Sequence, residues 1–144
     1  MSEDLQHINS FLEEHHVMSL ATTGDDALSV CSLFYVYIAS LESFVVASSL
    51  ETTHIKHIEK NTSVAGNILL ETKKVGEIKG VQFRGEFSKL ESSTLKMHYF
   101  KKFPYSLALN PTLWQIKVDY FKMTDNKLGF GKKLIWKGVS VHIY

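Results

Sequence analysis

Residues 17–49 read VMSLATTGDDALSVCSLFYVYIASLESFVVASS, and this stretch decides the fold. It contains three runs rich in β-branched and aromatic residues, a composition typical of strands, at 17–23, 28–39 and 43–49. Gly24, Asp25 and Asp26 form a turn signal between the first two runs, and the connection to the third run is equally short. Strands joined so closely pair antiparallel, so the stretch predicts a three-stranded meander.

On either side of this meander the residue pattern alternates between helix and strand. Apolar residues at helical or strand spacing predict, in order, a helix at 3–15, a helix at 52–60, a strand at 63–71, a strand region at 75–91, a helix at 92–102 and a strand at 114–125. Ser2 is expected to cap the first helix. Gly80 and Gly85 lie inside the strand region and predict a bend or bulge there.

The last predicted strand alternates along its length, with one face formed by Trp114, Ile116, Val118 and Tyr120. The segment at 104–111 is bracketed by prolines and fits either a loop or a broken helical turn. Residues 126–136 are basic and punctuated by glycines, and the tail at 139–144 fits either a final strand or a loose end.

Together these elements predict a mainly β fold of six or seven antiparallel strands with peripheral helices. Closure into a small barrel is the simplest arrangement, because it removes exposed strand edges. The chain has 144 residues and no linker or repeat, so residues 1–144 are expected to form a single domain.

Composition excludes several classes of protein. The net charge of +1 does not favour nucleic-acid binding, and no apolar stretch is long enough for a membrane helix, so neither partner is expected. The single cysteine, Cys31, cannot form an internal disulfide, and the acidic N-terminus is not a signal peptide. The cytoplasm is therefore the expected compartment.

Three segments carry a resemblance to a known family: SSLETTHIKHIEKN at 48–61, GVQFRGE at 80–86 and MTDNKLGFGKKLIW at 123–136. With the order of the elements around them, they resemble the flavin-binding split barrels related to pyridoxamine-phosphate oxidase. Within that superfamily the chain is most similar to the uncharacterised bacterial YhbP-like group. The resemblance covers nearly the whole chain and implies a split β-barrel that dimerises and holds FMN between two subunits.

The first candidate site is the segment before the second predicted helix. Hydroxyl groups can donate hydrogen bonds to a phosphate, and the candidates are Ser48, Ser49, Thr52, Thr53 and His54. The resemblance places His54 where a phosphate-binding Lys or Arg is common, and a neutral imidazole carries no charge. The alternative is that a threonine merely caps the helix while the serines end a strand.

The second and third candidate sites lie on strands. The resemblance implies that the backbone of Leu33, Phe34 and Tyr35 runs beside the flavin ring, with Phe34 or Tyr35 flanking it by stacking. Core packing is the alternative for alternate residues of that strand. Gln82 resembles a polar residue that reaches a flavin across the dimer interface. Arg84 could pair with a phosphate, but we favour a solvated strand face with a cross-strand ion pair.

The fourth candidate is the glycine-containing segment at 124–133, in which Lys132 would cover an anionic cofactor or substrate; an exposed turn is the alternative. His54 and His57 lie three residues apart and could face one ligand. No histidine–cysteine cluster has zinc-ligand spacing, so no metal site is predicted.

These sites support two functions of different classes. The first is an FMN-dependent oxidoreductase acting on an unknown small molecule at a dimer-interface site, with no catalytic side chain apparent in the sequence. The second is a non-catalytic flavin- or haem-binding protein of the same fold. A homodimer is expected because a barrel of six or seven strands is too small to enclose a flavin.

Overall fold

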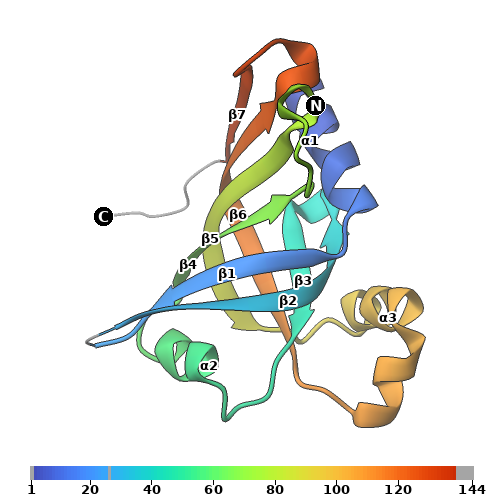
Figure 1. The fold of residues 1–144 in the computed structure, drawn as a ribbon. Coiled ribbons are helices and arrows are strands. Elements are labelled where there is room, and N and C mark those ends of the chain that lie inside the picture. The colour runs from blue at the N-terminus through green and yellow to red at the C-terminus, as the bar shows by residue number, and fades with distance from the viewer. Residues whose placement is uncertain (1, 26, 139–144) are drawn as a thin grey trace.

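The computed structural model describes residues 2–25 and 27–138 and contains seven strands and three α-helices (Figure 1). The strands are β1 (Val17–Thr23), β2 (Leu28–Ile38), β3 (Ser43–Ala47), β4 (Ser63–Leu69), β5 (Lys79–Lys89), β6 (Leu113–Asp125) and β7 (Lys133–Lys137). The α-helices are α1 (Glu3–Glu14), α2 (Thr53–Ile58) and α3 (Ser93–Lys102). Short 3-10 turns connect them at Ala39–Leu41, Val75–Glu77, Pro104–Leu109 and Asn126–Leu128.

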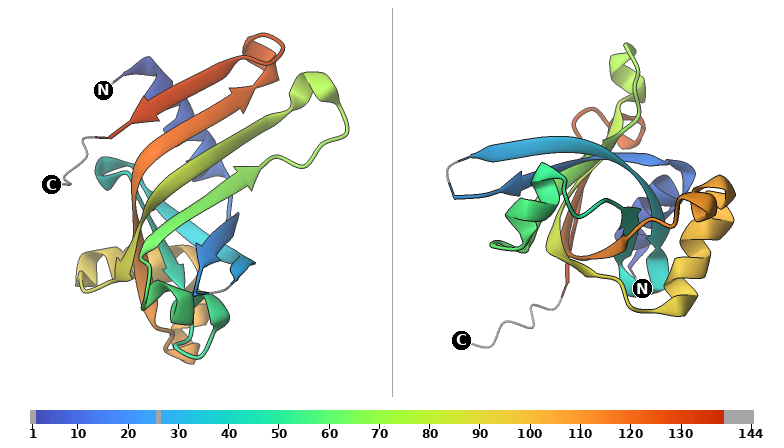
Figure 2. Two further views of the ribbon diagram at one scale, coloured as in Figure 1. Left: turned by 90° about the vertical axis from the view of Figure 1, so that its left-hand side faces the viewer. Right: turned by 90° about the horizontal axis from the view of Figure 1, so that it is seen from below.

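The strands form one antiparallel sheet in the order β3-β2-β1-β4-β5-β6-β7. A further pairing between β3 and β6 closes six of the strands into a barrel, and β7 adds to the outer edge of β6. The left view of Figure 2 shows β7, β6, β5 and β4 side by side on one wall. The expected mainly β split barrel is confirmed.

Aromatic rings fill the interior of the barrel. Phe44 on β3 is completely buried and contacts four other rings, those of Tyr35, Tyr37, Phe83 and Phe121, with centroid distances of 4.9 to 6.3 Å. Buried tyrosines must hydrogen-bond, and here the hydroxyl of Tyr35 donates to the Leu12 carbonyl at 2.7 Å and that of Tyr37 to Asn9 Oδ1 at 2.7 Å. These bonds attach α1 to the barrel.

Two of the three α-helices begin with a side-chain cap. Ser2 Oγ accepts a hydrogen bond from the Leu5 amide at 3.1 Å, as expected for α1, and Ser92 caps α3 in the same way. Thr52 is the N-cap residue of α2, but its side chain makes no capping bond and donates instead to the Ser49 carbonyl at 2.9 Å.

Several predicted bounds need correction. The strand region expected from residue 75 begins at Lys79, because residues 75–77 form a 3-10 turn. The basic segment expected as one glycine-punctuated stretch ends in a strand, β7, whose Leu134 is buried against the core. The tail at 139–144, predicted as strand or loose end, lies outside the described residues.

The predicted bulge lies at Gly85. The register of β5 against β6 shifts between Arg84 and Gly85, so that Asp119 on β6 is the extra residue. A Cβ atom at Gly85 would lie 2.4 Å from the Lys117 carbonyl oxygen, so only glycine fits here without a shift. After the shift Phe121 and Met123 face the core, and Tyr120 lies on the outer face of the sheet. The expectation that Tyr120 shares a face with Val118 is therefore wrong.

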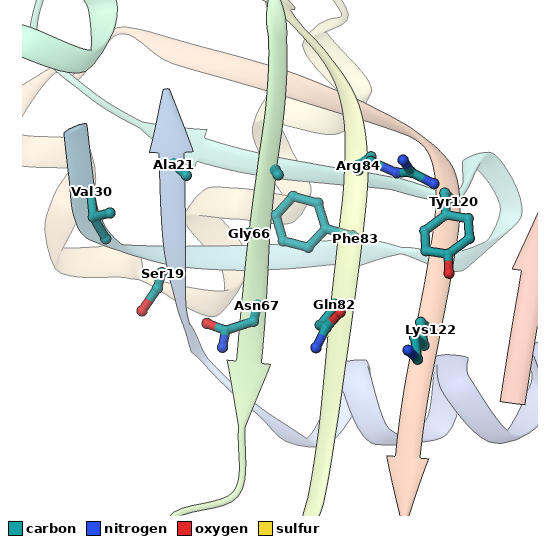
Figure 3. Close-up of a pocket in the computed structure, with 11 residues that line it drawn as sticks. Ser19, Ala21, Val30, Gly66, Asn67, Gln82, Phe83, Arg84, Tyr120 and Lys122 are labelled. Atoms are coloured by element: carbon teal, nitrogen blue, oxygen red, sulfur yellow. The ribbon is translucent and has the colours of Figure 1, made fainter. Parts of the chain in front are cut away.

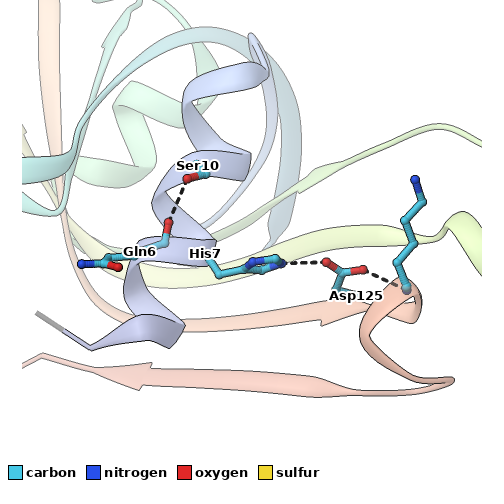
Figure 4. A network of polar contacts seen from close by, with 5 residues as sticks. Gln6, His7, Ser10 and Asp125 are labelled. Carbon is cyan, nitrogen blue, oxygen red and sulfur yellow. Dashed lines mark hydrogen bonds and ion pairs between the residues drawn. The ribbon is translucent and has the colours of Figure 1, made fainter.

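A buried carboxylate joins α1 to the end of β6 (Figure 4). Asp125 is 1% exposed, and its two oxygens accept from His7 Nε2 at 2.7 Å and from the Lys127 amide at 3.0 Å. Burial by itself raises the pKa of Asp125, but these hydrogen bonds and nearby Lys79 outweigh it, so the pKa lies below its usual value. The charged form of Asp125 therefore stabilises the folded chain.

We expect Asp125→Asn to lower the free energy of unfolding by about 1–3 kcal/mol at pH 7, because the buried charge-assisted bonds are lost. A carboxylate with a depressed folded pKa stabilises the fold above its unfolded pKa of about 4, and this stabilisation is lost as the pH falls through the folded pKa. Urea unfolding at pH 7 and pH 3 should show a smaller pH difference in the variant. Asp119→Asn, at an exposed aspartate of the same strand, is the control. An unchanged pH difference in Asp125→Asn would contradict this role.

Candidate functional site

A shallow hollow of about 590 Å³ lies on the outer face of the sheet (Figure 3). Its lining comes from five adjacent strands and comprises Ser19, Ala21, Val30, Ala65, Gly66, Asn67, Gln82, Phe83, Arg84, Tyr120 and Lys122. The strand register places Ser19, Asn67, Gln82 and Lys122 in one row across β1, β4, β5 and β6. Gln82 is the predicted site residue that lies in this hollow.

Gly66 forms the floor of the hollow because it has no side chain. A Cβ atom at Gly66 would lie 2.4 Å from the Ser19 carbonyl oxygen and 2.5 Å from the Phe83 ring. The Phe83 ring packs into this space from the core side and is 1% exposed. The Phe83 ring therefore lies directly beneath the backbone of Gly66 at the floor of the hollow.

Arg84 is held over an aromatic ring at the upper rim of the hollow. Its guanidinium carbon lies 4.2 Å from the centroid of the Tyr120 ring, a cation–π contact. The cross-strand ion pair favoured for Arg84 is replaced by this contact. The next acid along β5, Glu86, accepts hydrogen bonds from the hydroxyls of Thr62 and Ser63.

The segment predicted to bind a phosphate, residues 48–54, has a buried part and an exposed part. Ser48 and His54 are both 8% exposed, and Ser48 Oγ lies 2.6 Å from His54 Nε2. Burial and the neighbouring His57 lower the pKa of His54, which favours the neutral imidazole. Ser48 also accepts a hydrogen bond at its carbonyl from Trp114 Nε1 at 3.0 Å. This pair therefore holds the segment in place and adds no positive charge to it.

The hydroxyls of Ser49 and Thr53 belong to the exposed part, and Thr52 is half-buried. Ser48 and Ser49 line a second hollow of about 470 Å³ between residues 47–51 and residues 109–112. The two histidines of α2 diverge: His54 faces Ser48, whereas His57 Nδ1 lies 3.0 Å from Thr22 Oγ1 on β1. They do not face one ligand.

The three predicted residues on β2 differ in exposure. Tyr35 is completely buried, so its ring belongs to the core and cannot flank a ligand outside the barrel. Of the two rings expected to flank a flavin, Phe34 stays a prediction. The Tyr35 amide donates to the His16 carbonyl and its carbonyl accepts from Lys102 Nζ, each at 2.9 Å. Leu33 is half-buried, and Phe34 is 57% exposed and points outward.

One edge of β2 is unpaired over residues 28–34 in the described part of the chain. Residues 28–34 pair with β1 alone, and residues 35–38 pair with β3 alone. Half of the backbone groups of residues 28–34 therefore lie along an edge that no described strand covers. This edge includes two of the predicted positions, Leu33 and Phe34.

Within one chain, Lys132 lies far from the hydroxyl-bearing residues at 48–53. It is exposed in the turn between β6 and β7, where its carbonyl accepts from the Asp125 amide at 3.1 Å. Figure 1 shows this turn at one end of the barrel and α2 at the other. The fold thus brings Gln82 into the outer hollow. It leaves the hydroxyl-bearing residues at 48–53 and Lys132 at opposite ends of the barrel.

Comparison with known proteins places the chain in a family. No protein-family model matches it. It is 37% identical to a UPF0306 protein of Photorhabdus laumondii, over 94% of this chain and 97% of that protein. It is 35% identical to the UPF0306 protein YhbP of Escherichia fergusonii, over 93% of each chain. The chain belongs to the UPF0306 family. The resemblance to the YhbP-like group is thereby confirmed.

Solved structures similar to this UPF0306 protein share its fold at low sequence identity. A haem-binding protein of Mycobacterium smegmatis has a TM-score of 0.78 at 12% identity, covering 96% of this chain and 59% of that one. An FAD-binding protein of Mesorhizobium loti has a TM-score of 0.68 at 16% identity, covering 82% and 90%. A putative pyridoxamine 5'-phosphate oxidase of Listeria innocua has a TM-score of 0.69 at 15% identity, covering 84% and 98%. These likenesses show the split-barrel fold.

Two further features of this UPF0306 protein concern the described residues only. Within residues 2–25 and 27–138, no three His, Cys, Asp or Glu side chains are grouped so that they could hold a metal ion. Over the same residues, no helix is long and apolar enough to span a membrane.

Tyr120 and Lys122 line the outer hollow and were not predicted from the sequence. Strict alternation along β6 places Tyr120 in the core, and only the bulge at Asp119 turns it to the outer face beside Lys122. Gly85 could have indicated this. A bulge at Gly85 shifts the alternation of inward and outward side chains on the paired strand, β6.

Proposed function

We propose that this UPF0306 protein binds FMN between the two subunits of a homodimer and acts as an oxidoreductase on a small molecule. Bound FMN would supply the redox chemistry, and the protein would supply position and electrostatics. Similar folds bind flavin or haem, as the names of the Mesorhizobium loti and Mycobacterium smegmatis proteins state. The proposed compartment is the cytoplasm, where an unpaired cysteine is ordinary.

The observation that carries the two-subunit proposal is the distance between the candidate residues in one chain. Ser49 precedes α2, Thr53 is the first residue of α2, and Lys132 lies in the β6–β7 turn. Figure 1 shows α2 and this turn at opposite ends of the barrel. A single flavin can contact both the hydroxyl residues and Lys132 only if these come from different subunits. We therefore assign Ser49, Thr52 and Thr53 of one subunit to the phosphate, and Gln82 and Lys132 of the other subunit to the remainder of the site.

The outer face of β1 and β2 supports a second copy of the chain as the partner. Four apolar residues are exposed there: Val17, Leu28, Val30 and Phe34, with exposed fractions from 46% to 84%. The register pairs Val17 directly with Phe34, so their side chains are neighbours. Grouped exposed apolar side chains of this kind mark interaction surfaces, and a homodimer would bury the same patch on both subunits.

The phosphate assignment predicts that Ser49→Ala and Thr53→Val each weaken FMN binding about tenfold, because each removes one hydroxyl donor from a charged group. Riboflavin, which lacks the phosphate, should bind wild type and variants equally. Quenching of flavin fluorescence measures both affinities, and Ser88→Ala at an exposed serine of β5 is the matched control. Equal losses for FMN and riboflavin would contradict the phosphate assignment.

Mixing two weakened variants tests whether the site spans two subunits. In a heterodimer of Thr53→Val and Lys132→Gln chains, one site is intact and the other carries both changes. A 1:1 mixture that has exchanged subunits should therefore recover wild-type affinity at about a quarter of its sites. No recovery, or a monomer by light scattering, would reject the shared site.

A haem-binding protein is the second candidate function, and one site favours it. His16 is exposed directly before β1. Partial desolvation together with the positive charge of Lys102 lowers its pKa, which favours the neutral imidazole that ligates iron. Exposed Val17 and Phe34 lie next to it. The absorbance spectrum of the purified protein separates the two functions, since haem gives a Soret band and flavin absorbs in the blue.

A further inference from the structure

The outer hollow carries positive charge without a matching acid. Arg84 and Lys122 both line it, and none of the eleven lining residues is an aspartate or glutamate. Glu86, the next outward residue on β5, is hydrogen-bonded to the hydroxyls of Thr62 and Ser63. The hollow therefore presents two cations to solvent with no lining carboxylate to neutralise them.

The contact with Tyr120 holds the Arg84 side chain in a position from which it can bind an anion. Stacking over the Tyr120 ring at 4.2 Å fixes the plane of the guanidinium while its N–H groups remain able to donate in that plane. Carboxylates and phosphates accept two parallel hydrogen bonds from such a fork. Since the side chain is held before any ligand arrives, less conformational entropy is lost on binding.

The remaining lining fits the rest of a small organic molecule. Asn67 and Gln82 offer amide groups in the same row as Lys122, and Figure 3 shows the three side chains side by side on β4, β5 and β6. Ala21 and Val30 give an apolar border on β1 and β2. A volume of about 590 Å³ lies within the range of small-molecule sites.

We infer that this hollow is an anion-recognising subsite, in which Arg84 and Lys122 bind the carboxylate or phosphate of a small, partly apolar molecule. Gln82 belongs both to this hollow and to the proposed flavin site, so the bound molecule is the substrate of the flavin-dependent reaction. That last identification rests on the proposed function, whereas anion binding by the hollow does not.

Phenyl phosphate is a suitable probe, with phenol as its uncharged match. Arg84 is the only arginine of the chain, so one guanidinium Nε–H resonance in a ¹H–¹⁵N spectrum reports on this site alone. Phenyl phosphate should shift that resonance in a saturable manner, and phenol at the same concentration should not. Absence of a saturable shift, or an equal shift with phenol, would overturn the inference.

Substitutions then test the two cations separately. Arg84→Gln and Lys122→Gln should each weaken phenyl phosphate binding about tenfold or more in calorimetric titration, since each removes a charge-assisted contact. Lys101→Gln, which removes one exposed lysine from α3, is the control and should leave the affinity unchanged. Circular dichroism of each variant confirms that it is folded. Unchanged affinity in folded Arg84→Gln would overturn the inference.

A competition experiment separates this subsite from the flavin site. Phenyl phosphate should still bind when the protein is saturated with FMN, and Arg84→Gln should keep its riboflavin affinity. If FMN abolishes phenyl phosphate binding, the two ligands occupy the same space in the hollow, and a subsite separate from the flavin is rejected. If FMN does not bind at all while phenyl phosphate still shifts Arg84, the proposed function fails and the anion site stands.

Discussion

Phe44→Ala is expected to lower the free energy of unfolding by about 3–5 kcal/mol. The ring is completely buried and contacts Tyr35, Tyr37, Phe83 and Phe121, so its removal leaves a cavity bordered by four rings. These rings come from three strands, β2, β5 and β6, and cannot collapse together without moving the barrel wall. Because small domains are stable by only about 5–15 kcal/mol, this single change removes a large part of the total.

Urea denaturation measures this effect as a lower midpoint with an unchanged slope. Phe130→Ala is the matched control, because the same ring is deleted from the β6–β7 turn, where Phe130 is 84% exposed. The control should change the free energy of unfolding by less than about 0.5 kcal/mol. Similar losses in both variants would show that Phe44 is not the centre of the core.

Gly66→Ala is expected to destabilise the fold by about 1–3 kcal/mol, and Gly66→Val by more. The added Cβ would lie 2.4 Å from the Ser19 carbonyl oxygen, which is a backbone atom on the neighbouring strand, and 2.5 Å from the Phe83 ring. Neither can move freely, because β1 and β4 are paired here and the ring is packed in the core. The substitution should also distort the floor of the outer hollow, so binding of phenyl phosphate should weaken together with stability.

Gly76→Ala is the control for this effect. Apart from its two chain neighbours, no residue has an atom within 4 Å of a Cβ built at Gly76, so alanine fits there. Replacing this glycine should leave stability unchanged or raise it by up to about 1 kcal/mol, because alanine has fewer conformations to lose on folding. Thermal melts of the two variants should therefore move in opposite directions or differ by several degrees. Equal melting temperatures would contradict the contacts assigned to Gly66.

The strands could be predicted from the sequence because their signals are local. Residues 17–23 appear as β1 without any change of bounds, and the helix predicted at 3–15 ends within one residue of its observed end. Ser2 as a cap and Gly85 as a bulge follow equally from short-range chemistry. The 3-10 turn at 75–77 was missed because alternation of side chains does not distinguish a strand from the short turn that precedes it.

The candidate site was predicted less well, because its residues come from strands distant in the sequence. Gln82 was singled out, yet its neighbours in the row, Asn67 and Lys122, lie 15 residues before it and 40 residues after it. For Arg84 the sequence favoured an ion pair, and the structure shows the Tyr120 ring instead. Ser48 and His54, predicted as phosphate contacts, lie buried and paired with each other in the subunit.

The sequence by itself determined where most strands and turns lie along the chain and the mainly β barrel class, because hydrophobic alternation and turn residues act over a few positions. The tertiary structure decided which side chains share a surface. The closing pairs between β3 and β6 and the shift at Gly85 set the register, and the register moves Tyr120 from the core face to the outer one. A one-residue shift has this effect because successive side chains of a strand point to opposite faces, and only contacts between strands fix where the shift occurs.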